Sequence, residues 1–395
     1  MNSKRFTALK PALGLALGAS LSAGVLAQSN LENEYPELAQ LYDSFYVTHA
    51  AAMDAIAGIN ADPATAQARE GLRDNLEMMA GMSHMEMMSM MSVQAGEEDA
   101  HAAMGHSMNT GMGGPFGERE AEARVNLGRM IRAEYSEAEV STAYRSSSAL
   151  PTHAAMTLEY GRQFESNLWN IWADADMSIS AKVTASNQAV ADYASGDEMH
   201  AVSLQPKSAA LYLDSPYADA LQTGFPRISG LLWSNQWLQL ASLEAIIVGQ
   251  VDPQFANRVD VTLERYNNKL GSDTGMSMFP PPTEMPSAPA ISPQLYSLVP
   301  QAAIIIDNLN MMETAIADII AYPNLDNRED AIIEVVEQFT SDANNADDMD
   351  YLLSALRGGI FNQGGPAIGE LSGSERNRSR EMMDMVHTMI MSSPQ

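Results

Sequence analysis

Methionine and histidine side chains are concentrated in one tract, residues 78–112, and their spacing suits a soft metal ion. Thioether sulfur and neutral imidazole are good ligands for Cu(I), and Ag(I) shares that softness. A thioether has no proton to lose, so its metal binding does not compete with protonation as that of a thiolate does. The candidate ligands are Met78, Met82, His84, Met85, Met87, Met88, Met91, His101, Met104, His106, Met108 and Met112.

The spacing of these residues would bring several of them to a common face. Side chains three or four positions apart are neighbours on a helix, and Met78, Met82 and Met85 meet that condition. In the glycine-rich segment that follows, pairs such as His101 with Met104 could chelate an ion once the backbone folds around it. We therefore expect the tract to bind an ion through a helix face and a flexible loop together.

Core packing and oxidant scavenging are alternative roles for the tract. Methionine is an adaptable packing residue and could fill a core, and it could also consume oxidants by forming sulfoxide. At about 100° per residue, however, the methionines between residues 78 and 91 point in nearly every direction around a helix, and Glu77, Ser83 and Glu86 lie among them. A buried helix would not carry that polar set, so the sequence favours metal binding.

Short motifs in the tract carry a resemblance to a known class of protein. His84-Met85-Glu86-Met87 and His101-Ala102-Ala103-Met104 have a His-x-x-Met spacing, and Met82-Ser83-His84 has the Met-x-His pattern. These motifs resemble the Met/His-rich segments of periplasmic copper- and silver-resistance proteins. A second Met-rich segment, residues 382–391, is similar, whereas residues 118–373 carry no such resemblance. The resemblance implies an extracytoplasmic buffer for Cu(I) or Ag(I).

The N-terminus predicts export. Basic residues (Lys4, Arg5 and Lys10) precede an apolar run, and small residues lead up to Ala27. These are the three parts of a secretory signal peptide, and the apolar run is too short to be a good membrane anchor. We expect a periplasmic or secreted protein whose mature chain begins at Gln28.

Charge and cysteine content exclude several classes of partner and site. The formal net charge is −28, and loss of the basic residues of the leader would take it to −31. Such an acidic surface argues against binding to nucleic acid or to anionic lipid, both of which need basic patches. The chain has no cysteine, so it can form no disulfide and offer no thiolate to a metal. Packing must stabilise the fold.

Hydrophobic periodicity predicts an all-α protein, because apolar residues recur at helical spacing and strand-like alternation is scarce. The most apolar stretch, residues 231–248, is interrupted by polar residues, which predicts a buried helix in a soluble core and no membrane insertion after cleavage. The expected organisation is a signal peptide (1–27), a helical hairpin with a Met-rich second helix (28–93), a flexible Gly/Met/His loop (94–117), a helical domain (118–270), a Pro-rich linker (271–295), a helical segment packing on the same domain (296–357), a Gly-rich linker (358–374) and a Met-rich C-terminal helix or tail (375–395).

No catalytic motif is present in the sequence, so we expect a binding protein and not an enzyme. Histidine-containing zinc motifs, P-loops and dinucleotide fingerprints are absent. His153 with Met156, and Met199 with His200, are isolated pairs that we interpret as surface or satisfied residues and not as a second metal site. The alternative function is a structural or interaction protein of the cell envelope. Its Met-rich helix would then be a plastic hydrophobic surface for a partner helix or for self-association.

Overall fold

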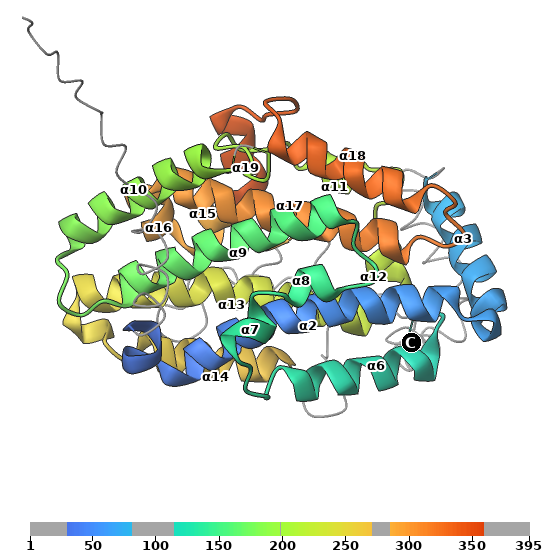
Figure 1. Cartoon of the computed structure of the whole chain (residues 1–395), viewed down its shortest axis with the longest axis horizontal. Helices are drawn as coiled ribbons and strands as arrows, with labels where there is room; N and C mark the ends of the chain where they lie inside the picture. The colour runs from blue at the N-terminus through green and yellow to red at the C-terminus, as the bar shows by residue number, and fades with distance from the viewer. Residues whose placement is uncertain (1–29, 81–113, 198, 271–284, 359–395) are drawn as a thin grey trace, which may run out of the picture.

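The computed structural model describes residues 30–80, 114–197, 199–270 and 285–358. Within these ranges the chain is predominantly helical, and an isolated bridge between Lys207 and Asn345 is the only β-type pairing (Figure 1). The all-α class expected from the sequence is therefore confirmed. The predicted signal peptide, most of the methionine/histidine tract, the Gly-rich linker and the C-terminal segment lie outside the described residues.

Long helices surround the centre of the molecule and run along its length (Figure 1). They are α2 (Pro36–Ala61), α9 (Thr152–Ala173), α13 (Pro226–Val251) and α17 (Pro300–Ala321). Helices α2 and α9 each pack against both α13 and α17, so all four share one core. Helices α2, α13 and α17 begin with proline, which suits the first helical position because the N–H it lacks would have no intrahelical partner there.

A second set of helices covers this centre. Helix α6 (Gly117–Met130) lies on α2 and α13, and α14 (Arg258–Leu270) lies on α13. Helices α10 (Ile179–Gly196) and α18 (Arg328–Thr340) lie on α9 and α17. Helix α3 (Ala66–Ala80) packs against the short α12 (Ala220–Gly224), and α19 (Asp348–Gly358) packs against the short α15 (Ala288–Ile291). The short connecting helices are η1 (Pro63–Thr65), α7 (Glu137–Val140), α8 (Ala143–Ser146), α11 (Ala210–Leu213), α12 (Ala220–Gly224), η2 (Pro253–Phe255), α15 (Ala288–Ile291) and α16 (Pro293–Leu298).

Helix α13 is buried on nearly all sides, as its apolar sequence predicts. Its polar residues are buried too, and several have hydrogen-bond partners. The Tyr266 hydroxyl donates to Asn235 at 2.8 Å, and the backbone N–H of Gln294 donates to Glu244 at 2.9 Å. These bonds offset the cost of burying polar groups. Across the described residues, no helix combines the length and apolar character needed to cross a membrane.

The described end of the expected Pro-rich linker differs from the prediction. Residues 288–295 are not an extended strap, because they form α15 and the start of α16 and lie against the core. Ala288 and Ile291 are fully buried, and the backbone N–H of Ala288 donates to Asp307. Pro289 and Pro293 stand at helix starts, where proline is compatible with a helix. The prolines at 289 and 293 therefore belong to helices and do not mark a linker.

The expected division of the chain also differs from the packing of its helices. Helix α2 of the predicted hairpin shares its core with α9, α13 and α17. The segment 296–357, which was predicted to pack on the helical domain, contributes to that core as well. Helix α3 packs against α12 and η1, and its Leu72 and Leu76 are buried. Residues 30–76 thus belong to the same hydrophobic core as the helices that follow.

Candidate functional site

The predicted metal ligands fall almost entirely outside the described residues. Met78 is the exception. It lies in the last turn of α3, beyond the buried Leu72 and Leu76, and 43% of its surface is exposed. The other ligands, Met82, His84, Met85, Met87, Met88, Met91, His101, Met104, His106, Met108 and Met112, lie in residues 81–113. In the part of the chain that the structure describes, no three His, Asp or Glu side chains are grouped so as to hold a metal ion.

A buried cluster of polar side chains occupies the centre of the four long helices, and we call it the central polar cluster. It contains His49 and Tyr46 from α2, Tyr144 from α8, Glu165 from α9 and Glu313 from α17, all of them buried. His49 Nδ1 lies 2.9 Å from one carboxylate oxygen of Glu313, and the Tyr144 hydroxyl donates to the other at 2.9 Å. The Tyr46 hydroxyl donates to Glu165 at 2.8 Å. Helical spacing puts Tyr46 and His49 on one face of α2.

The two carboxyl groups of this cluster have opposite electrostatic environments. Burial raises the pKa of Glu165 to about 8, because the hydrogen bond from Tyr46 offsets only part of the desolvation and the nearby Glu313 adds to it. Burial also acts to raise the pKa of Glu313. Attraction to His49 and the hydrogen bonds from His49 and Tyr144 outweigh that effect, so this pKa lies below its ordinary value. At neutral pH the cluster therefore holds one carboxylic acid and one carboxylate.

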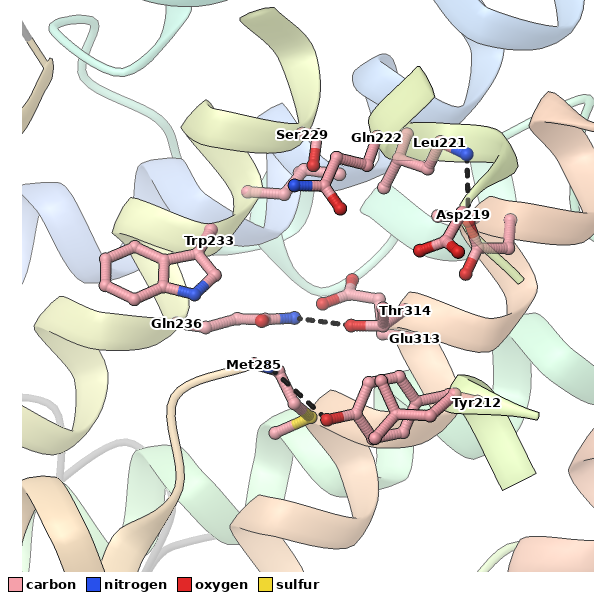
Figure 2. Close-up of a pocket in the computed structure, with 14 residues that line it drawn as sticks. Tyr212, Asp219, Leu221, Gln222, Ser229, Trp233, Gln236, Met285, Glu313 and Thr314 are labelled. Atoms are coloured by element: carbon pink, nitrogen blue, oxygen red, sulfur yellow. Dashed lines mark hydrogen bonds between the residues drawn. The ribbon is translucent and has the colours of Figure 1, made fainter. Parts of the chain in front are cut away.

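A cavity of about 50 Å³ adjoins the cluster through Glu313. Figure 2 shows Gln236 and Thr314 pointing toward each other across it, with the two side-chain atoms 3.5 Å apart, and the indole of Trp233 lying at one side. Asp219 lines another part of the wall. The volume is enough for water or a small ion and far below the roughly 300 Å³ or more of a typical organic ligand site.

Two further carboxyl groups line this cavity. The Asp318 carboxylate accepts a hydrogen bond of 2.8 Å from the backbone N–H of Leu221. Burial raises the pKa of Asp318 to about 8, and the neighbouring Asp219 adds to that rise. Asp219 has a positive φ of 63°, a backbone conformation that aspartate tolerates better than most residues. With Asp318 protonated at neutral pH, the cavity is less negative than its residue types suggest.

A larger cavity of about 250 Å³ lies on the other side of Tyr212 and Met285, which line both cavities. Its wall includes Asp307, which accepts a 2.6 Å hydrogen bond from the Tyr351 hydroxyl and whose pKa burial raises to about 7. Met311 also lines it. The wall also includes Lys207, Asp350 and several serines, so it is mixed in polarity. Both carboxylate oxygens of Asp307 already accept hydrogen bonds within the fold.

Comparison with known proteins gives no relative. No protein-family model matches the sequence, no curated protein matches it, and no solved structure matches the fold.

The acids of the central region were missed by sequence reasoning. They stand singly in strongly apolar helices, as Asp307, Glu313 and Asp318 do in α17. The available signal was the presence of charged residues within a helix whose other faces are apolar, because such residues are almost never buried without a partner. No local pattern could pair them, since His49 and Glu313 are 264 positions apart.

Proposed function

We propose that this protein is an exported, non-enzymatic binder of soft monovalent metal ions, Cu(I) or Ag(I), through the thioethers and imidazoles of residues 78–112. The observation that carries the proposal is the spacing of methionine and histidine in that tract. The exposure of Met78 supports it, because the tract begins where α3 passes beyond its buried residues Leu72 and Leu76. A methionine in that place can be reached by an ion.

The small number of methionines in the described hydrophobic core supports the proposal, because it shows that methionine is not the main packing residue of this fold. The buried methionines of the described core, Met53, Met285, Met311 and Met312, are few beside the leucine, isoleucine and alanine there. The described helices thus build their core mainly from other residues. Since the chain has no cysteine, soft-metal binding in an oxidising compartment would rest on ligands that form no disulfide.

Copper K-edge X-ray absorption of the Cu(I)-loaded mature protein tests the ligand set. The proposal predicts a first shell of sulfur with some nitrogen, and a loss of the sulfur scattering when the methionines of residues 78–112 are replaced by leucine. Leucine resembles methionine in volume and helix propensity, so the circular dichroism should hardly change. A first shell of nitrogen and oxygen only would overturn the proposal. If the leucine variant also kept any self-association of the wild type, a partner surface would be favoured instead.

A further inference from the structure

The fold brings together two histidines that are far apart in the sequence. His153 lies in the first turn of α9, and His200 follows the end of α10. Their ring centres are 5.1 Å apart with an angle of 52° between the ring planes. A metal–imidazole bond is about 2.1 Å long, so one ion could bridge two rings at this separation. Neither residue suggested this contact when the sequence was considered by itself.

The position of His200 is fixed by a network of hydrogen bonds. Its Nδ1 lies 2.8 Å from the carboxylate of Asp197. The backbone N–H of Asp197 donates to the Tyr160 hydroxyl at 3.1 Å, and that hydroxyl donates to the backbone oxygen of Tyr193 at 2.8 Å. Tyr160 lies two turns after His153 on α9, so one helix face positions both histidines. A carboxylate on one imidazole nitrogen orients the ring and leaves the other nitrogen for a metal.

The ligand types near this pair are soft as well as basic. Met156 lies one helical turn after His153, on the same side of α9, and 39% of its surface is exposed. Met199 immediately precedes His200 and is 67% exposed. Large exposed apolar side chains are few in the described part of the chain, and two of them flank this pair. His153 makes no hydrogen bond or ion pair with any described residue, whereas the buried His200 is bonded to Asp197.

We propose that His153 and His200 form a second metal site, for a soft monovalent ion such as Ag(I) or Cu(I), with Met156 and Met199 as flanking thioether ligands and Asp197 as the residue that positions His200. A monovalent soft ion is favoured over Zn(II) for two reasons. No third His, Asp or Glu joins the pair among the described residues, as a structural zinc site would require, and thioether prefers the softer ion. This site does not depend on residues 78–112.

Histidine footprinting with diethylpyrocarbonate, read by peptide mass spectrometry, tests the site residue by residue. The mature protein would be treated in chloride-free buffer with and without micromolar Ag(I). We expect Ag(I) to protect the half-buried His153, which reports for the pair because His200 is buried. Protection of His153 should be lost in His200→Gln, which removes the second imidazole of the pair. His49, which is 2% exposed and paired with Glu313, serves as the internal measure of folding, because it should stay unmodified throughout.

Two variants complete the test. Asp197→Asn should weaken the protection by about tenfold in Ag(I) concentration, as expected when a residue that orients a ligand is lost. A second variant replaces the methionines of residues 78–112 by leucine and the histidines there by glutamine. It should keep the protection of His153, so the two proposals can fail separately. Unchanged protection of His153 in His200→Gln, or no protection in the wild type, would show that the rings only pack together. Protection by Zn(II) and not by Ag(I) would also overturn the proposal.

Discussion

Several buried carboxyl groups in this fold have pKa values well above those of exposed carboxyl groups. Burial raises the pKa of Glu120, Glu244 and Asp307 to about 7 and that of Glu165 and Asp318 to about 8. Each of these groups binds a proton in the folded state at a pH where the unfolded chain has lost it. The fold should therefore lose stability as the pH rises from mildly acidic to mildly basic.

Asp318 offers the clearest test of this pH dependence. Its pKa is about 8 in the fold and about 4 in the unfolded chain, so its contribution is fully present below about pH 4 and is lost as the pH rises through about 8. Asp318 should lower the free energy of unfolding by at most about 1.4 kcal/mol per pH unit. Asp318→Asn keeps an acceptor for the backbone N–H of Leu221 and should flatten the dependence in urea unfolding. The exposed Asp176→Asn is the control. An equal slope in wild type and Asp318→Asn would contradict the assignment.

The pair of His49 and Glu313 tests the central polar cluster. Both side chains are almost fully buried, at 3% and 6% exposure. His49→Leu leaves the Glu313 carboxylate without its main partner, which should lower the free energy of unfolding by about 3–5 kcal/mol. In the His49→Leu background, Glu313→Leu should lower the free energy of unfolding by less than it does in the wild type. The difference between the two effects, the coupling energy, should be roughly 0.5–3 kcal/mol. Urea unfolding of the four proteins measures this coupling, and additive effects would show that the two residues are energetically independent.

At the scale of helices, close packing between α9 and α17 depends on a residue without a side chain. A Cβ atom at Gly161 would overlap the side chain of Leu309 on α17, whereas one at Gly58 on α2 would meet nothing. Both glycines lie inside helices, where alanine is intrinsically preferred by about 1 kcal/mol. The difference between the two positions is therefore one of packing.

Alanine substitutions at these glycines should have opposite effects. Gly58→Ala should raise the free energy of unfolding by up to about 1 kcal/mol, because only helix propensity changes. Gly161→Ala should lower it by about 1–3 kcal/mol, since overpacking the α9–α17 contact outweighs that gain. Thermal unfolding followed by circular dichroism measures both. A stabilising effect of Gly161→Ala would mean that the two helices can separate at little cost.

The sequence predicts the helices well but not the contacts between them. The buried residues 231–248 follow from local apolar pattern, and α13 confirms them. The helix at 288–291 was missed because its prolines indicated a linker, although its packing depends on Asp307, which comes later in the chain. The contact between His153 and His200 was also missed, because the two residues are distant in the sequence. Pairings between distant residues are set by the fold, which local patterns of one sequence do not specify.

At the scale of the whole molecule, an acidic helical scaffold is joined to a tract of candidate soft ligands. The described helices share one core, and the tract begins at the exposed Met78. The net charge of −28 would attract cations to the surface, weakly and less so at high salt. Selectivity for Cu(I) or Ag(I) would come from the thioethers, because carboxylates prefer harder ions.

Competition for Cu(I) against a chromophoric chelator tests metal binding by the tract most directly. The purified protein should withdraw Cu(I) from the chelator at micromolar concentrations. A variant with leucine in place of the methionines of residues 78–112 should withdraw much less and keep its helical content. If the wild-type protein leaves the chelator fully loaded, or if the leucine variant competes as well as the wild type does, the thioethers of the tract are not the ligands.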